Sequence, residues 1–248
     1  MARSFLVGGV VALAAAMSAP VHAQDGVLGK EEVEAIVRDY LLANPEIVRD
    51  ALEALEEKAT AAEAAQRQQV LDDRRDLLEN SETQIVLGNP EGSVTLVEFF
   101  DYNCGYCKRA LGDMLDLMAE DPDLRVVMKE FPVLGPGSLE AARVSMALTL
   151  AEPDKYLAFH ERLLSAEEPA GEDTALAAAE AVGADMDMLR LRLEDPAVLE
   201  AIRESYSLAD ALGLNGTPSY VVGDSVIVGA QGYDTLKDAV DTARESEG

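Results

Sequence analysis

The residues with the clearest potential for chemistry are the two cysteines of this 248-residue chain, Cys104 and Cys107, with Gly105 and Tyr106 between them. They follow an apolar run at residues 94–100 and open a stretch with helical periodicity. The first sulfur should therefore lie at a helix N-terminus, where unpaired backbone N–H groups and the helix dipole stabilise a thiolate. A thiolate at a helix end, with a second thiol one turn behind it, can exchange disulfides.

Other uses of a Cys-x-x-Cys pair fit the sequence less well. A structural zinc site needs four nitrogen or sulfur ligands, and His160 is the only plausible histidine to accompany the cysteines. We expect His160 to be a partly buried packing residue instead. A structural disulfide is geometrically possible, but it would close so short a loop that it would constrain the unfolded chain little. The sequence therefore predicts redox chemistry with no metal ion and no other cofactor.

The N-terminus has the pattern of a cleaved export signal. Arg3 precedes an apolar stretch at residues 5–16, and a small-residue cleavage site ends at Ala23. We expect residues 1–23 to be a signal peptide and the mature chain to be exported to a bacterial periplasm, which is oxidising for thiols. No other segment approaches the roughly twenty apolar residues that span a bilayer. The formal net charge of −27 argues against nucleic acid and anionic membranes as partners, because both would repel the chain.

Residues 24–80 are expected to be helical throughout. The pair Asn44-Pro45 should end one helix and begin a second one, which runs to about residue 79. The apolar positions of the second helix follow a four-three rhythm at Val48, Leu52, Leu55, Ala59 and Ala62. So narrow a seam buries little surface alone, so it must pack on the main domain or on copies of itself. We expect a homo-oligomer formed through residues 24–80, with a loosely docked, solvated stalk as the alternative.

The rest of the chain, residues 81–248, mixes strands and helices. The expected strands lie at residues 85–87, 94–100, 124–130, 219–222 and 226–228. The expected helices lie at residues 104–120 and 233–244, with a longer helical stretch at about 138–212. A right-handed β-α-β unit, a helical insert and a β-β-α unit make an α/β thioredoxin fold with an inserted helical domain and an N-terminal helical extension.

Three segments of this domain resemble the DsbA-like thioredoxin family. They are FFDYNCGYCK at residues 99–108, KEFPVLG at residues 129–135, and GTPS at residues 216–219. The N-terminal helices resemble the ScsC-type branch, which includes proteins linked to copper tolerance and some self-associating disulfide isomerases. The resemblance covers most of the chain after the signal and is most specific around the cysteines. It implies a periplasmic thiol-disulfide interchange protein whose cysteine pair is reset by a membrane redox partner.

The catalytic roles follow from the residue types and from the resemblance. Cys104 is the expected nucleophile because it lies at the helix end, and Cys107 should resolve the mixed disulfide. Glu98 would be costly to bury as a carboxylate, and a raised pKa would suit it to accept the Cys107 proton through a water. A buried acidic residue at this spacing in the family supports that role. An edge position, where Glu98 simply meets solvent, is the alternative.

Thr217, Pro218 and Tyr106 are the expected substrate-binding residues. Any Thr-Pro pair can form an ordinary trans turn at a strand start. The resemblance, however, implies a cis bond, which would let the neighbouring backbone face the sulfurs and pair with an extended client. Tyr106 should flank the same groove. Asp101 and Tyr102 should shape the loop before the active helix.

The expected activity is disulfide exchange on unfolded or misdisulfided exported proteins. Strongly oxidising members of the family carry a histidine between the cysteines, which this chain lacks, so a milder oxidant is expected. An oligomer with facing sites would favour a disulfide isomerase or reductase. Two alternatives stay open. One is a monomeric disulfide-donating oxidase, and the other is a chaperone-like protein that holds clients or Cu(I), for which paired thiolates are soft ligands.

Overall fold

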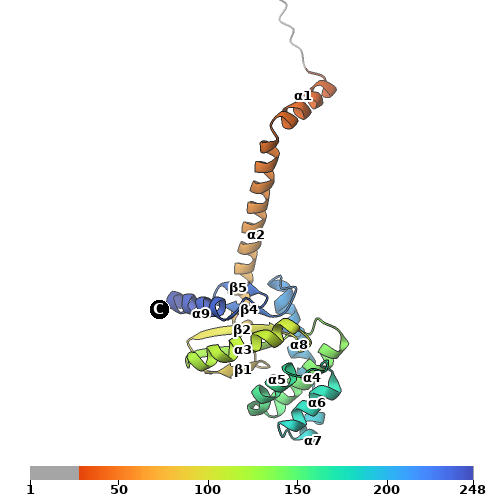
Figure 1. Ribbon diagram of the computed structural model, residues 1–248, viewed down its shortest axis with the longest axis vertical. Coiled ribbons are helices and arrows are strands. Elements are labelled where there is room, and N and C mark those ends of the chain that lie inside the picture. Colours follow the sequence, from red (N-terminus) through yellow and green to blue (C-terminus); the bar gives the residue numbers. More distant parts are fainter. Residues whose placement is uncertain (1–27, 248) are drawn as a thin grey trace, which may run out of the picture. The chain divides into compact units, whose positions relative to one another are not determined.

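The computed structural model describes residues 28–247, so the expected signal peptide at residues 1–23 lies outside the described residues (Figure 1). The chain divides into two compact units, of which the first ends at Lys58. Helices α1 (Lys30–Ala43) and α2 (Pro45–Asn80) are separated by one residue, as the Asn-Pro pair predicts. Among the described residues, no helix combines the length and the apolar character that crossing a membrane requires.

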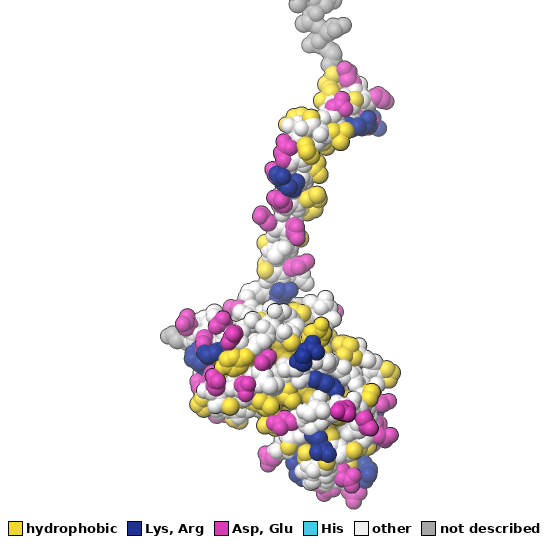
Figure 2. Space-filling view, viewed as in Figure 1, with side chains coloured by type: hydrophobic (Ala, Val, Ile, Leu, Met, Phe, Trp, Pro, Cys, Tyr) yellow, Lys and Arg dark blue, Asp and Glu magenta, His cyan; other side chains and the backbone are white. Residues whose placement is uncertain are grey.

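The N-terminal unit has no buried side chain among its described residues, 28–58. Apart from the half-buried Leu41, its large apolar side chains are exposed, namely Leu28, Val33, Ile36, Val37, Tyr40, Leu42, Ile47, Val48, Leu52 and Leu55. Figure 2 shows apolar and acidic side chains sharing the surface of this unit. The predicted apolar seam of α2 is therefore open to solvent in the single chain. Helices without a core of their own are only marginally stable in water.

The second unit begins at Ala59, and its described residues contain a five-stranded sheet in the order β1-β3-β2-β4-β5. The strands are β1 (Ile85–Gly88), β2 (Val94–Phe100), β3 (Leu124–Glu130), β4 (Ser219–Val222) and β5 (Ser225–Val228). β2 and β3 are parallel and are joined by α3 (Gly105–Glu120), whereas the other strand pairs are antiparallel. Together with the last helix, α9 (Tyr233–Glu247), this arrangement confirms the predicted thioredoxin fold.

Alternate residues of the central strand β2 face opposite sides of the sheet. Leu96 and Phe100 belong to the core cluster that includes buried residues of α3 and α9, whereas Val97 and Phe99 belong to a second cluster. Glu98 has the same parity as Leu96 and Phe100. The period of the strand therefore turns the Glu98 carboxyl toward the face that carries the cysteine helix.

The second cluster contains residues of α8 (Pro196–Ala211) and of the later part of α2. Leu71 and Leu78 of α2 are each 1% exposed and share this cluster with Phe99. The later part of α2 is therefore core structure of the second unit. The earlier part of α2, including the whole predicted seam from Val48 to Ala62, is exposed.

The helical insert lies between β3 and β4. Before α8 it contains α4 (Pro136–Ala151), a 3-10 turn (Pro153–Lys155), α5 (Tyr156–Leu164), α6 (Glu172–Ala181) and α7 (Met186–Leu193). The side chains of Asp185 and Asp195 accept hydrogen bonds from backbone N–H groups at the starts of α7 and α8, where aspartate is a favoured N-cap residue. α8 packs against both α4 and β3, so the insert and the sheet share this helix.

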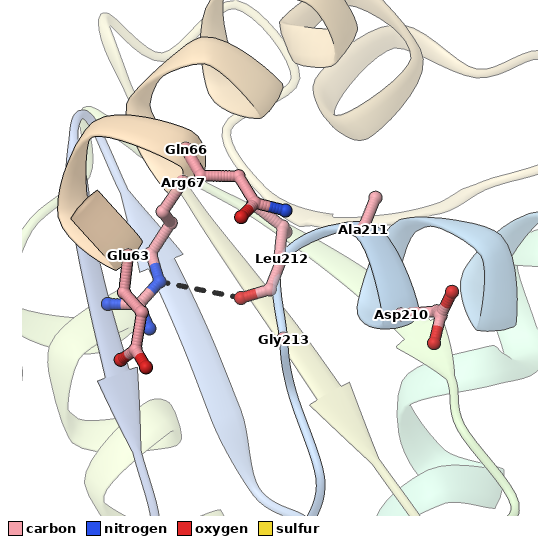
Figure 3. Close-up of a pocket in the computed structure, with 7 residues that line it drawn as sticks. All are labelled: Glu63, Gln66, Arg67, Asp210, Ala211, Leu212 and Gly213. Carbon is pink, nitrogen blue, oxygen red and sulfur yellow. Dashed lines mark hydrogen bonds between the residues drawn. The ribbon is translucent and has the colours of Figure 1, made fainter. Parts of the chain in front are cut away.

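A cavity of about 280 Å³ lies between α2 and the end of α8 (Figure 3). Its lining residues are Glu63, Gln66, Arg67, Asp210, Ala211, Leu212 and Gly213. Arg67 Nε donates a hydrogen bond to the Leu212 carbonyl oxygen at 3.4 Å, at a helix C-terminus where a cation is favourable. No residue of the cysteine segment lines this cavity. We therefore interpret it as a feature of α2 packing on α8.

Candidate active site

Cys104 occupies the N-cap position of α3, with an extended backbone at φ −78° and ψ 113°. Its Sγ accepts a hydrogen bond from the Cys107 backbone N–H at 3.4 Å. The Cys104 N–H in turn donates to the Asp101 carbonyl oxygen at 3.0 Å, which closes the turn before the helix. The predicted place of the first sulfur, at the helix N-terminus, is confirmed.

The structure strongly favours the ionised form of Cys104. A hydrogen bond from the Cys107 thiol is the largest cause of a pKa lowered from 9.0 to about 5, and burial acts in the opposite direction. The Thr217 side chain and the backbone N–H groups of Tyr106 and Cys107 lower the pKa further. The pKa of Cys107 is raised by the same hydrogen bond, then by burial and by the charge of Glu98. At neutral pH, one sulfur is therefore a nucleophile and the other keeps its proton.

The nucleophile is more covered than a position at an exposed helix end implies. Both cysteines are free thiols in the structure, and Cys104 is 4% exposed while Cys107 is 1% exposed. Tyr106, by contrast, is 60% exposed. The guanidinium carbon of Arg109 lies 4.3 Å from the centroid of the Tyr106 ring, close enough for a cation–π contact. Tyr106 therefore presents an exposed aromatic surface, backed by Arg109, two residues from the nearly covered sulfur.

The Thr217–Pro218 peptide bond is cis, as the family resemblance implied. Cys104 Sγ lies 3.1 Å from the Thr217 carbonyl oxygen, to which the protonated thiol donates a hydrogen bond, so this loop reaches the nucleophile directly. The Gly229 N–H donates to the Pro218 carbonyl oxygen at 2.8 Å and fastens the loop to the residue after β5. The structure thus brings together two segments that are far apart in the sequence.

Glu98 lies inside β2 and is 4% exposed, which excludes the alternative of an edge position in solvent. Its pKa rises from 4.5 to about 8, because of burial first and the charge of Cys104 second. An interaction with the Tyr220 hydroxyl opposes this rise, although it is not a well-formed hydrogen bond. A carboxyl group with such a pKa can accept and release a proton near neutral pH.

Asp101 and Asn103 fasten the loop before the cysteines to the chain around the insert. The buried Asp101 side chain accepts hydrogen bonds from the backbone N–H groups of Asn103, at 2.7 Å, and Leu134, at 2.9 Å. The Asn103 side chain donates to Ser138 Oγ and exchanges two hydrogen bonds with the Ala170 backbone, at 2.8 to 3.0 Å. The role of Asn103 was not foreseen. The available signal was an amide residue directly before the first cysteine.

Tyr102 and His160 belong to a buried polar network behind the site. The Tyr102 hydroxyl lies 3.0 Å from Ser145 Oγ and 3.2 Å from His160 Nδ1, and the Tyr156 hydroxyl lies 2.9 Å from the same nitrogen. Burial lowers the pKa of His160 from 6.5 to about 3, so the ring stays neutral. The prediction of partial burial for His160 is wrong, since the residue is 1% exposed.

A Cys-x-x-Cys pair at the start of the helix after a central strand of a thioredoxin fold, with one activated sulfur, defines a thiol-disulfide oxidoreductase. The family model described as the DSBA-like thioredoxin domain matches residues 95–241. The chain belongs to this family. A second model, the copper resistance protein ScsC N-terminal domain, matches residues 30–62, which span α1 and the first part of α2.

Solved structures agree with this assignment. A thioredoxin-like oxidoreductase from Silicibacter pomeroyi DSS-3 is 46% identical, covers 69% of this chain and 98% of its own, and has a TM-score of 0.66. Proteus mirabilis ScsC in a transitional conformation is 31% identical, covers 87% of this chain and 97% of its own, and has a TM-score of 0.67. The ScsC match extends the similarity beyond the part that the Silicibacter protein covers.

Curated relatives match part of this chain and belong to proteins of different lengths. Disulfide bond formation protein D of Bacillus subtilis is 25% identical over 168 residues, which is 64% of this chain and 76% of that protein. The chain spans only about a quarter of the Na(+)/H(+) antiporter NhaA of Herminiimonas arsenicoxydans, with 27% identity over 160 residues. The antiporter name therefore says nothing about the activity of the present chain.

Proposed function

We propose that the chain is a periplasmic protein disulfide oxidoreductase that acts on exported proteins and works mainly as an isomerase or reductase. One observation carries the chemistry, namely a Cys104 sulfur whose pKa is lowered to about 5 and which lies 3.1 Å from the Thr217 carbonyl oxygen. Such a sulfur is ionised at neutral pH and lies beside a backbone that can pair with an extended client. Export is supported by the signal-like pattern of residues 1–23.

The proposed reaction begins with the Cys104 thiolate. It attacks one sulfur of a client disulfide, and the other client sulfur leaves as a thiolate and takes a proton from water. The mixed disulfide can then be attacked by another client thiol, which is isomerisation and regenerates Cys104. Alternatively, Cys107 gives its proton to Glu98 and attacks Cys104, which oxidises the protein pair and reduces the client disulfide. A membrane redox partner would return the oxidised pair to dithiol.

The groove for clients is assigned to Tyr106, Thr217 and Pro218. Tyr106 offers an exposed aromatic face, and Thr217 offers a backbone carbonyl next to the nucleophile. Leu134, whose N–H is held by Asp101, is 54% exposed and extends the apolar surface of this loop region. Backbone pairing with shallow apolar contacts suits unfolded clients of varied sequence.

The reduction potential is the first test of the direction of exchange. When the pKa of the nucleophilic cysteine is one unit lower, the reduction potential of the couple is about 30 mV higher, so the couple is more oxidising. Thioredoxin, whose nucleophile has a pKa of about 7, has a potential of about −270 mV. A Cys104 pKa of about 5 therefore predicts about −210 mV. Equilibration with glutathione measures this value, and a potential near −120 mV, that of DsbA, would contradict it. Tyr106→His should make the couple more oxidising, while Tyr106→Phe should leave it unchanged.

The preference for isomerisation rests on self-association of the N-terminal unit. Its described residues bury no side chain, and α2 exposes Leu52 by 61% and Leu55 by 63%. Burying an exposed leucine is worth roughly 1.5 to 3 kcal/mol, so packing this seam on copies of itself would stabilise both helices. Several sites in one oligomer could hold and reshuffle a misfolded client at high effective concentration.

Charged residues introduced into the apolar seam of α2 should dissociate the oligomer into monomers. We expect the mature chain to sediment as an oligomer and the variant Leu52→Glu with Leu55→Glu to sediment as a monomer, because carboxylates would be buried at the contact. Ala54→Glu with Ala61→Glu adds the same charge at exposed positions off the seam and should leave the oligomer intact. Deleting residues 24–80 would be a poor test, since Leu71 and Leu78 are core residues. A mature chain that is already monomeric removes the physical basis for the isomerase preference.

A further inference from the structure

A buried tyrosine hydroxyl faces the candidate proton acceptor from the neighbouring strand. Tyr220 in β4 lies directly opposite Glu98 in β2, so the two side chains share one face of the sheet. Tyr220 is 0% exposed, and its hydroxyl has no hydrogen-bond partner among the described residues. Leaving a buried hydroxyl unpaired costs free energy, and native proteins contain few such groups.

The other neighbours of Glu98 in the sheet and on α9 offer it no hydrogen-bond donor. On the opposite side, β3 places Met128 next to Glu98, and a thioether cannot donate a hydrogen bond. α9 contributes Leu236 and Val240 to the same core cluster. The titratable groups that interact with Glu98 or with Tyr220 are Cys104 at the N-cap of α3, Cys107 and Asp113 on α3, and Tyr156 on α5. Among the described neighbours, none is a cation.

We propose that the Tyr220 hydroxyl is the hydrogen-bond donor that holds the Glu98 carboxylate in place to take the Cys107 proton. The inference rests on the proposed function, because it concerns the resolution of the mixed disulfide. In that step the Cys107 proton passes to Glu98, the Cys107–Cys104 bond forms, and the Cys104–client bond breaks. The client sulfur leaves as a thiolate and is protonated by water. Tyr220 acts through Glu98 and is a positioning residue.

The Tyr220 hydroxyl is needed at one stage of the disulfide-exchange cycle. While Cys104 is a free thiolate, its charge and the burial of Glu98 favour the protonated carboxyl, so the Tyr220 hydroxyl has no anion to bind. In the mixed disulfide the charge on Cys104 is gone, and Glu98 ionises more readily. A hydrogen bond to a carboxylate is about twice as strong as one between neutral groups. Tyr220 therefore stabilises ionised Glu98 when Cys107 must be activated.

The test separates the two sulfurs by their kinetics. The reduced full-length mature chain is mixed with the disulfide of thionitrobenzoate, which releases one coloured thiolate when Cys104 attacks and a second when Cys107 resolves the adduct. Tyr220→Phe keeps the ring and should leave the first release within about twofold. It should slow the second release about tenfold at neutral pH and move its pH midpoint up by about one unit. Tyr233→Phe removes an exposed hydroxyl that donates to Glu120, and it should change neither release.

Glu98→Gln completes the test as a double-mutant cycle. This substitution should slow the second release by itself, and adding Tyr220→Phe should slow it no further, because the carboxylate that the hydroxyl serves is absent. An unchanged second release in Tyr220→Phe, an equal slowing of both releases, or a further loss in the Glu98→Gln background overturns the inference. If the first release is no faster than that of a free cysteine, the proposed function itself fails, whatever Tyr220 does.

Discussion

Replacing Cys104 with serine is expected to abolish disulfide exchange, whereas replacing Cys107 with serine should trap clients as mixed disulfides. The thiol left in the Cys104→Ser variant is 1% exposed and has a raised pKa, so it is neither ionised nor accessible. Reshuffling of a scrambled client should therefore fall by at least about a thousandfold. In Cys107→Ser the new hydroxyl can still donate to Cys104, whereas Cys107→Ala removes the hydrogen bond that lowers the Cys104 pKa most, so attack by Cys104 should slow in the alanine variant.

Refolding of a scrambled client and non-reducing electrophoresis measure these two effects. Cys107→Ala, which also removes the resolving thiol, should give the same adducts as the serine variant. Undiminished refolding of the client by Cys104→Ser would favour the alternative in which the chain holds clients without exchanging disulfides. Absence of adducts with Cys107→Ser would contradict the assignment of Cys104 as the nucleophile.

The fold was largely predictable because its strands are short apolar runs with clear ends. The strands at residues 94–100 and 124–130 have the predicted bounds, since both are buried on two faces, the first is followed by the polar residue Asp101, and the second ends two residues before Pro132. The break between α1 and α2 was marked by an Asn-Pro pair. What could not be predicted is where a helix packs. α2 reads as one amphipathic helix, yet its first part is exposed and Leu71 and Leu78 are core residues.

The site was predictable only where chemistry leaves a short motif. Cys104 and Cys107 can be identified from their spacing, and the Thr-Pro pair can be identified from its resemblance to a segment of a known family. Asn103 and Tyr220 cannot be identified from the sequence in this way, because their partners lie in segments that only the fold brings together. Strand parity would place Tyr220 on the inner face, but the residue opposite it follows from the pairing register alone.

Glu130, in another part of the core, is a position where strand parity alone is informative. It shares its parity on β3 with Val126 and Met128, so an inward position could have been inferred from the sequence. Glu130 is 2% exposed, and both of its carboxyl oxygens are buried without a hydrogen-bond partner among the described residues. Burial is the main cause that raises its pKa well above the usual value. A neutral carboxyl group in this position avoids the larger cost of a buried charge.

The stability of the dithiol form should depend on pH through Cys104. Its pKa is about 5 in the folded chain and 9.0 in the reference state, so the folded state binds fewer protons between these values. A lowered folded pKa stabilises the native state above the unfolded pKa, and this contribution is lost as the pH falls through about 5. The thiolate should therefore add about 2–3 kcal/mol to the free energy of unfolding at pH 7, and nearly nothing at pH 4.

The titration of Glu98 must be removed for this measurement, because its raised pKa of about 8 has the opposite effect on the pH dependence of the free energy of unfolding. A carboxyl group whose folded pKa is raised destabilises the native state as the pH rises from its unfolded value, 4.5, toward 8. Urea unfolding of reduced Glu98→Gln, compared with Glu98→Gln carrying Cys104→Ser, isolates the thiolate, because the other carboxyl groups cancel in the difference. We expect the difference to rise between pH 5 and pH 7. Oxidised Glu98→Gln, compared with the same serine variant, should show no such rise, because the disulfide leaves no thiol to titrate. A flat difference over this range would mean that Cys104 is not an activated thiolate, and the mechanism would lose its nucleophile.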